Sequence, residues 1–192
     1  METLLLSLTV TALAEIGDKT QLLALVLASR FRQPRPILMG ILLATLVNHA
    51  LAGALGMWLT SVASPDALRW GLGLSFLGLA AWMLTVDSTP SKEPRAATGI
   101  GAFGTTVIGF LLAELGDKTQ LVTVALTARY GMPLSIVVGS SLGVLLADAP
   151  VVLAGSKLAG KLPVRLVQAT GAATLALLGI ATFIATSPGQ LY

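Results

Sequence analysis

The residue types that are absent or rare in this sequence already exclude several classes of protein. Cysteine is absent from the 192 residues, which excludes disulfides, thiolate metal sites and cysteine nucleophiles. A single histidine leaves no nucleophile–histidine–acid set for hydrolysis. Charged residues make up only 11% of the chain, whereas an average soluble domain has about a quarter. We therefore expect neither a soluble enzyme nor a resident cofactor.

Apolar residues take the place of the missing charge. They account for 55% of the chain, and the mean hydropathy is +0.86. They form blocks of the twenty or so residues that a helix needs to cross a bilayer. The six blocks are Thr3–Ser29, Pro36–Ser61, Ala67–Val86, Ile100–Ala128, Pro133–Ser156 and Leu162–Ser187. The sequence predicts an all-α integral membrane protein with six transmembrane helices and no soluble catalytic domain.

Basic residues are distributed unequally between the two sets of loops. The loops after the first, third and fifth blocks hold Arg30, Arg32, Arg35, Lys92, Arg95, Lys157, Lys161 and Arg165, and the opposite set holds Arg69 and Arg129. By the positive-inside rule the richer set faces the cytoplasm. We expect a multi-pass protein of the cell membrane with both termini outside the cytoplasm. The basic residues indicate orientation and do not indicate nucleic-acid binding.

One stretch of sequence occurs twice. Ala14–Leu22 reads AEIGDKTQL and Ala113–Leu121 reads AELGDKTQL, with eight of nine positions identical at an offset of 99 residues. Each copy lies in the first of three apolar blocks. A three-span unit followed by its copy enters the membrane in the opposite sense, as in transporters with inverted repeats. The predicted organisation is two inverted three-helix repeats, residues 1–88 and 100–192, joined by a polar cytoplasmic linker at 89–99.

The repeated motif falls near the centre of the bilayer. It begins about twelve residues into its block, which is about 18 Å along a helix. On a continuous helix Glu15, Asp18 and Lys19 share one face, as do their counterparts Glu114, Asp117 and Lys118. A charge facing lipid at this depth costs about 2.5–3.5 kcal/mol, so both faces are expected to point inward, towards each other. Gly17 and Gly116 permit a break in the helix that would expose backbone carbonyls.

The charge of the motifs suggests a cation site. Each motif has two carboxylates and one ammonium group, so the pair has a net charge of −2 that one divalent cation or two protons would neutralise. Such a site favours exchange of metal for protons. Oxygen ligands suit Mn²⁺, Ca²⁺ or Mg²⁺ better than copper or zinc, and the metal would be substrate rather than cofactor. The candidate ligands are Glu15, Asp18, Glu114 and Asp117, supported by Lys19, Thr20, Gln21, Lys118, Thr119 and Gln120. The lysines would neutralise the aspartates in the empty site or extend towards an exit.

Three polar residues lie outside the motif. Asp148 is an isolated carboxylate deep in the fifth block, and its counterpart at an offset of 99 residues is His49, beside Asn48. A carboxylate that faces an imidazole across the two halves suggests a pathway or a proton relay. Hydrogen bonding of Asn48 and His49 between helices is the alternative.

Other functions are compatible with part of this pattern. The six motif charges could form a buried ion-pair cluster in a non-transporting membrane assembly factor. An exporter of small organic cations or amino acids would need a more aromatic pocket, and only 5% of the residues are aromatic. A channel is less consistent with a site that empties by protonation. The sequence leaves homo-oligomerisation open.

The doubled E-x-G-D-K-T-Q motif within six spans resembles the transmembrane protein 165 family, also known as uncharacterised protein family 0016. The resemblance covers essentially the whole chain. It implies a cation/proton antiporter that exports Mn²⁺ or Ca²⁺ from the cytosol, with the acidic pairs as the metal site. The short loops resemble those of bacterial members, which implies manganese as the substrate. The matched positions are Glu15, Gly17, Asp18, Lys19 and Thr20, and Glu114, Gly116, Asp117, Lys118 and Thr119.

Overall fold

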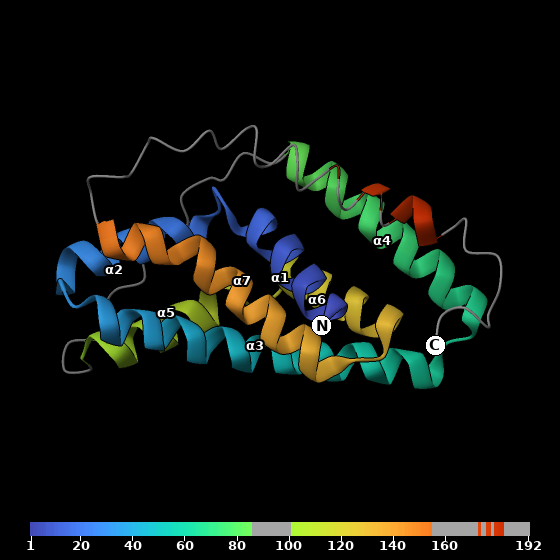
Figure 1. Ribbon diagram of the computed structural model, residues 1–192, viewed down its shortest axis with the longest axis horizontal. Coiled ribbons are helices and arrows are strands. Elements are labelled where there is room, and N and C mark those ends of the chain that lie inside the picture. The colour runs from blue at the N-terminus through green and yellow to red at the C-terminus, as the bar shows by residue number, and fades with distance from the viewer. Residues whose placement is uncertain (86–100, 155–172, 174–175, 178, 183–192) are drawn as a thin grey trace.

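The computed structural model describes residues 1–85, 101–154, 173, 176–177 and 179–182. Within these ranges the regular structure is helical, and there is no strand. The helices, drawn in Figure 1, are α1 (Glu2–Glu15), α2 (Lys19–Phe31), α3 (Pro34–Val62), α4 (Pro65–Thr85), α5 (Ala102–Ala113), α6 (Lys118–Tyr130) and α7 (Pro133–Ala154). The all-α prediction is confirmed for the described residues. The polar linker at 89–99 and most of the sixth predicted span, 162–187, lie outside them.

Two helices have the length and composition of a membrane span. These are α3, with 29 residues, and α7, with 22. Each begins at a proline, which suits the first turn because its missing N–H has no partner there in any case. α6 ends at Gly131, whose φ of 64° is the left-handed conformation that commonly terminates a helix. The loop predicted between the first and second apolar blocks directly precedes α3, and the loop predicted between the fourth and fifth blocks directly precedes α7.

The first and fourth predicted spans are not continuous helices. The chain leaves the helical conformation at residues 16–18, between α1 and α2, and again between α5 and α6 at residues 114–117. Both interruptions fall inside the repeated motif. The helix is therefore not continuous through either motif, and the break that Gly17 and Gly116 permit is present in both copies.

Many polar side chains are buried and many large apolar ones are exposed, which is unusual for a soluble protein. On α3 the buried face includes Thr45, Asn48 and His49, while Met39, Leu43, Val47, Leu51, Leu55 and Trp58 are exposed. Glu15, Glu114 and Asp148 are all 0% exposed. Exposed leucines and buried carboxylates are what a bilayer demands, because lipid solvates the former and not the latter. The chain is a membrane protein.

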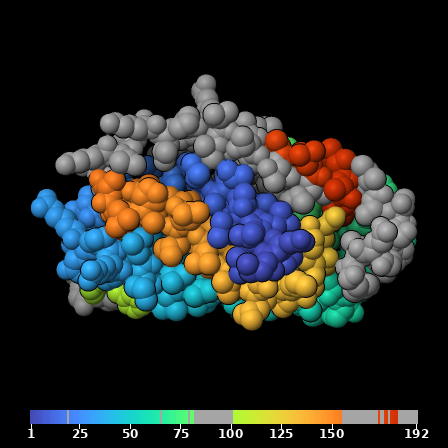
Figure 2. Space-filling model, in the orientation of Figure 1, coloured from blue at the N-terminus to red at the C-terminus, as the bar shows by residue number. Residues whose placement is uncertain are grey.

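The helices of the two halves exchange partners. α1 packs mainly against α7, and α5 packs mainly against α3. The first helix of each half therefore lies against the long helix, α7 or α3, of the other half. α3 and α7 also pack against each other, and their colours in Figure 1 show that they run in opposite directions. Figure 2 shows α1 lying alongside α7 on one face of the molecule. The contact of α1 with α7 is close, because a Cβ placed on Gly143 would lie 2.6 Å from the carbonyl oxygen of Leu8.

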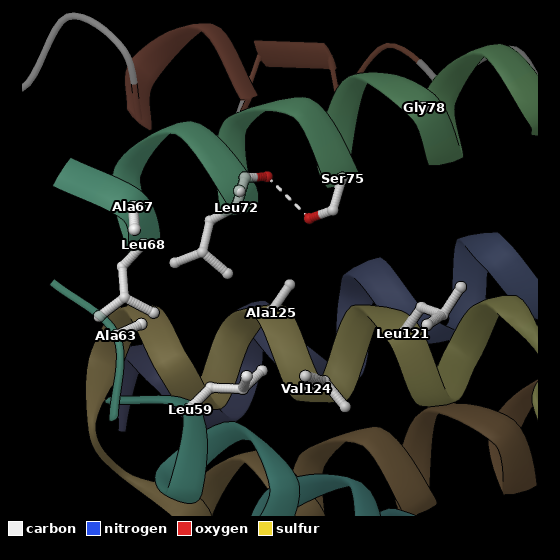
Figure 3. A pocket seen from close by; sticks show the side chains of 11 residues that line it. Leu59, Ala63, Ala67, Leu68, Leu72, Ser75, Gly78, Leu121, Val124 and Ala125 are labelled. Atoms are coloured by element: carbon white, nitrogen blue, oxygen red, sulfur yellow. Dashed lines mark hydrogen bonds between the residues drawn. The ribbon is translucent and has the colours of Figure 1, made fainter. Parts of the chain in front are cut away.

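α4 lies at the edge of this bundle and packs against α6. An apolar cavity of about 450 Å³ remains between α4, α6 and the end of α3, as Figure 3 shows. Its lining includes Leu59, Leu68, Leu72, Leu121 and Val124. The acidic residues do not line this cavity, which is a feature of packing at the edge of the bundle.

Candidate cation site

Both copies of the motif fold into the same turn. The amide of Asp18 donates to the carbonyl of Glu15 at 3.0 Å, and the amide of Asp117 donates to that of Glu114 at 3.1 Å. The intervening Gly17 and Gly116 have φ values of 82° and 74°, a conformation that strains residues with a Cβ. This turn ends one half-helix and starts the next, so carboxylates lie at the junction rather than along a helix face.

A glutamine holds each turn in place. Gln21 Oε1 accepts a hydrogen bond of 2.9 Å from the amide of Gly17, and Gln120 Oε1 accepts one of the same length from Gly116. Gln21 Nε2 also donates to the carbonyl oxygen of Ala147 on α7 at 3.0 Å. The glutamine that ends each motif therefore stabilises its turn, and in the first half it also fixes the turn to α7.

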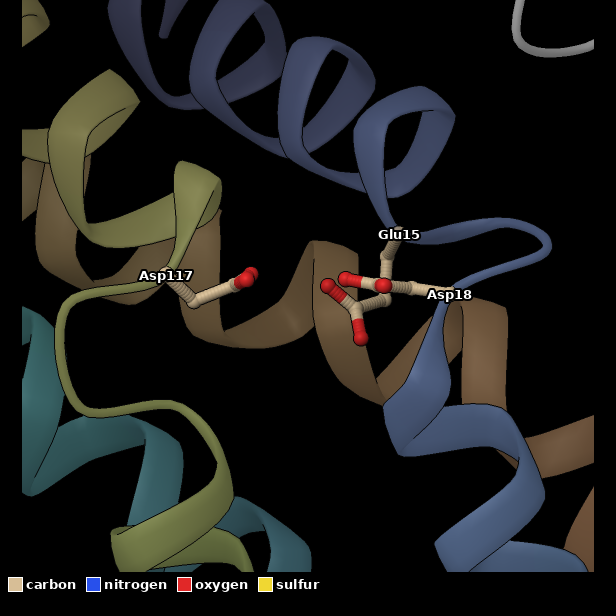
Figure 4. A group of neighbouring side chains, drawn as sticks. All are labelled: Glu15, Asp18 and Asp117. Carbon is tan, nitrogen blue, oxygen red and sulfur yellow. The ribbon is translucent and has the colours of Figure 1, made fainter. Parts of the chain in front are cut away.

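Carboxylates from the two halves meet at these turns. One oxygen each of Glu15, Asp18 and Asp117 lies within 4.8 Å of the other two, close enough to bind one ion. In Figure 4 Glu15 and Asp18 extend from the first turn, and Asp117 extends towards them from the second. All three residues are buried. The meeting of the two motifs expected from the sequence is present in the structure.

Two further carboxylates adjoin this group. Glu114 and Asp148 both lie near enough to Glu15 to repel it electrostatically, and Glu114 is itself close to Asp148. Among the described residues, neither oxygen of Asp148 has a hydrogen-bond partner. Asp148 therefore belongs to the acidic cluster, which we define as Glu15, Asp18, Glu114, Asp117 and Asp148. The charge count from the motifs alone did not include it.

An ion pair joins the two motifs. Lys118 Nζ lies 3.1 Å from Asp18 Oδ2. The lysine of the second half thus neutralises an aspartate of the first half, whereas the sequence did not specify which half supplies the partner. The side chain of Lys19 lies outside the described part of the structure.

The threonines of the two motifs differ. Thr20 Oγ1 donates to Glu15 Oε1, whereas Thr119 Oγ1 has no hydrogen-bond partner among the described residues. Both residues are 0% exposed. The repeated sequence therefore does not produce identical surroundings for the two glutamates.

The residues outside the motif separate into two groups. Asn48 lies beside the Glu114 carboxyl group, and its Nδ2 donates to the carbonyl of Leu111 at 3.4 Å. His49 Nδ1 lies 3.2 Å from Ser141 Oγ on α7, and no hydrogen bond joins His49 to Asp148. In the structure His49 thus forms a hydrogen bond between helices, which was the alternative to a relay with Asp148. Ser141 was not identified from the sequence, although a Ser140–Ser141 pair within an apolar block is a signal for it.

Comparison with known proteins identifies the family. The model of the divalent cation/proton antiporter GDT1 family matches the chain twice, over residues 3–91 and 102–190. The chain belongs to this family. The resemblance inferred from the doubled motif is confirmed, and the family is one of transporters rather than enzymes. The two matched ranges are offset by the same 99 residues as the motif.

Several relatives match over most of the chain. A Vibrio cholerae serotype O1 protein named "Putative manganese exporter" is 48% identical over 183 residues, which are 95% of this chain and 90% of that protein. GDT1-like protein 5 of Arabidopsis thaliana is 27% identical, covering 93% of each chain. GDT1-like protein 3 of rice (Oryza sativa subsp. indica) is 30% identical over 88% of this chain and 69% of its own. No solved structure matches the chain.

Proposed function

We propose that this protein exports Mn²⁺ from the cytosol in exchange for protons, with the acidic cluster as the site that binds either. The observation that carries the proposal is the convergence of Glu15 and Asp18 with Asp117 from the other half, one oxygen of each within 4.8 Å of the others. The five buried carboxylates outnumber the positive charge that Lys118 supplies, and the remaining negative charge is one that a divalent cation or protons can compensate. Hard oxygen ligands suit Mn²⁺ and Ca²⁺, and the relative named as a manganese exporter favours manganese.

The proposed architecture is a pair of inverted three-helix repeats. The opposite directions of α3 and α7, the exchanged contacts between the halves and the double match of the family model support it. Broken helices that meet at the middle of the membrane are a recurrent site for ions in such transporters. The proposed units remain residues 1–88 and 100–192 with a cytoplasmic linker at 89–99.

The proposed location is the cell membrane with both termini outside. Thr3 Oγ1 donates to Met132 Sδ at 3.2 Å, so the N-terminus and the loop between α6 and α7 are at the same end of the bundle. The charge distribution assigns both of these to the side opposite the cytoplasm. The contact therefore supports placing the N-terminus and this loop on the same side of the membrane.

Transport by the purified protein in vesicles tests the proposal. A metal-sensitive dye and a pH-sensitive dye should report Mn²⁺ movement coupled to proton movement in the opposite direction. Glu15→Gln and Glu114→Gln should each abolish Mn²⁺ flux, and the exposed Glu2→Gln should have no effect. Mn²⁺ flux without proton movement would contradict exchange, and Ca²⁺ moved in preference to Mn²⁺ would contradict the assigned substrate.

Growth of cells that lack their own manganese exporter distinguishes transport from a purely structural role. Wild type should restore growth in high manganese, and the two glutamine variants should not. Restored growth with both variants would indicate that the acidic cluster is a structural ion-pair network, as in an assembly factor.

A further inference from the structure

The two sides of the acidic cluster are chemically different, although the repeat places equivalent residues on each. Beyond the second motif the buried face of α6 carries Thr119, Thr123 and Thr127 at successive turns. The equivalent residues of α2, 99 positions earlier, are Thr20, Ala24 and Ala28. One half-helix thus continues from the site with hydroxyl groups and the other with methyl groups.

The helices opposite show the same difference at three positions, and the reverse at one, where Thr45 of α3 corresponds to Val144 of α7. Ser140 and Ser141 of α7 correspond to Ile41 and Leu42 of α3. Thr11 of α1 corresponds to Phe110 of α5, and both are 0% exposed. On the α2 side, Ala24, Ala28, Ile41, Phe110 and Val152 pack together in one apolar cluster.

The polar residues of the α6 side converge where α3, α6 and α7 meet. Thr127 faces α3, because its Oγ1 is 3.8 Å from the position of a Cβ on Gly53. The same Cβ would be 2.9 Å from Val137 of α7. One turn of α3 back towards the cluster, His49 Nδ1 lies 3.2 Å from Ser141 Oγ. We call Thr119, Thr123, Thr127, Ser140, Ser141 and His49 the hydroxyl track.

Several polar atoms of the hydroxyl track lack partners. Thr119 Oγ1, Thr127 Oγ1, Ser140 Oγ and His49 Nε2 have no hydrogen-bond partner in the described part of the structure, and these four residues are all 0% exposed. A buried threonine in a helix ordinarily bonds the carbonyl one turn earlier, as Thr123 does with Thr119 at 2.9 Å. A buried polar group without a partner costs about 1–3 kcal/mol, so three hydroxyls and one imidazole nitrogen on one side call for a ligand.

We propose that the hydroxyl track is the route by which the cation, with its water, passes between the acidic cluster and the membrane face at the loop joining α6 to α7. The track runs about 12 Å along α6 from Thr119 to Thr127, at 1.5 Å per residue. Hydroxyl and imidazole groups replace part of the hydration shell of a hard cation along this length. The α2 side is closed by the apolar cluster. This inference rests on the proposed function, and it adds that the two access routes are unequal.

Thiol labelling tests the route directly, because the chain has no cysteine of its own. Single variants Thr127→Cys and Ser140→Cys are compared with Ala28→Cys and Ile41→Cys at the equivalent positions. Met132→Cys and Gln33→Cys, both exposed, report the two membrane faces. The probe is a cationic methanethiosulfonate reagent that does not cross the bilayer, applied to each face during Mn²⁺ transport.

The expected result is that T127C and S140C react from the face that labels M132C. Each should react about tenfold faster than its counterpart A28C or I41C reacts from the face that labels Q33C, the ratio expected for a barrier lower by one hydrogen bond. Failure of both T127C and S140C to react, or rates equal to those of their counterparts, would overturn the proposal.

A transport measurement complements the labelling. Thr127→Val removes the hydroxyl with little change in volume and should slow Mn²⁺ flux, whereas Thr9→Val, on the exposed face of α1, should not. Unchanged flux in T127V would also count against the route. If labelling is symmetric while wild type still transports Mn²⁺, only this inference falls. If wild type transports no cation while labelling is asymmetric, the proposed function falls.

Discussion

The ammonium group of Lys118 lies 3.1 Å from the carboxylate of Asp18, so one ion pair ties the motif of the second half to that of the first. Both side chains are nearly buried, with 14% and 9% of their surface exposed. Breaking such a pair removes part of the compensation of a charge in a low-dielectric interior. The pair is the contact that a structural role for the motif would require, and it can be tested separately from transport.

Removing one partner of this pair should destabilise the protein more than removing both. Lys118→Met should cost up to about 3–5 kcal/mol because Asp18 loses this ion pair, and Asp18→Asn combined with Lys118→Met should recover much of that loss. Thermal unfolding in detergent measures the change, with the exposed Arg35→Gln as a control for loss of positive charge. Recovered stability without recovered Mn²⁺ flux would show that the charges act in transport as well. Equal destabilisation of the single and double variants would contradict the pairing.

The two motif threonines should respond differently to the same substitution. Thr20→Val removes the hydrogen bond to Glu15 and should cost about 1.5–3 kcal/mol, the range for bonds to charged groups. Thr119→Val removes a hydroxyl that has no partner among the described residues, and it should leave stability unchanged or slightly raised. Chemical unfolding of the two matched variants measures the difference. A larger loss for T119V than for T20V would contradict the asymmetry of the two turns.

Much of the fold follows from local sequence. The apolar blocks predict α3 and α7 closely, since a proline begins each and their exposed faces are apolar. The motif also predicts that Glu15 and Asp117 are buried near each other, because a charge that faces lipid at the middle of the membrane is energetically costly.

The remaining features depend on contacts between the halves. Periodicity alone favours a continuous helix through Glu15 and Asp18, and the break at Gly17 is decided by the turn that Gln21 holds against α7. The partners of Lys118 and His49 are likewise set by packing across the repeat. The position of Asp148 in the acidic cluster is also a tertiary feature, because an offset of 99 residues pairs it with a histidine rather than with another acid.

Alanine substitution of a motif glycine should be costly for backbone reasons alone. A Cβ on Gly116 would meet no atom of the described residues within 4 Å, but its φ of 74° is left-handed, which costs a non-glycine residue about 1–2 kcal/mol. Gly71 provides the matched control. A Cβ on Gly71 likewise meets no described residue, but Gly71 lies within α4, where alanine should stabilise by up to about 1 kcal/mol. Thermal unfolding of G116A and G71A should therefore shift in opposite directions, and a shift of G116A to higher temperature would contradict the turn geometry.

The close approach of α1 to α7 should be equally sensitive to added volume. Gly143→Ala places a methyl group 2.6 Å from the carbonyl oxygen of Leu8, a backbone atom that cannot rotate away. Overpacking of this kind costs about 1–3 kcal/mol. Gly78→Ala, whose new Cβ has no atom within 4 Å in the part of the chain that the structure describes, should be tolerated. The measurement is the unfolding temperature of each variant relative to wild type. A G143A protein as stable as wild type would show that α1 moves aside.

Asp148 should contribute to metal affinity although it lies outside the repeated motif. It is 0% exposed and electrostatically close to Glu15 and Glu114, and its two oxygens lack hydrogen-bond partners among the described residues. Asp148→Asn keeps the shape and removes one negative charge from the cluster. It should weaken Mn²⁺ binding by about 10–100-fold, the range seen when groups around a metal site are changed. Titration of the purified protein with Mn²⁺ measures the affinity, and Asp66→Asn, exposed at the start of α4, controls for loss of an acid elsewhere. Unchanged affinity in D148N, with E15Q still inactive, would remove Asp148 from the site and leave the two motifs as its sole source of carboxylates.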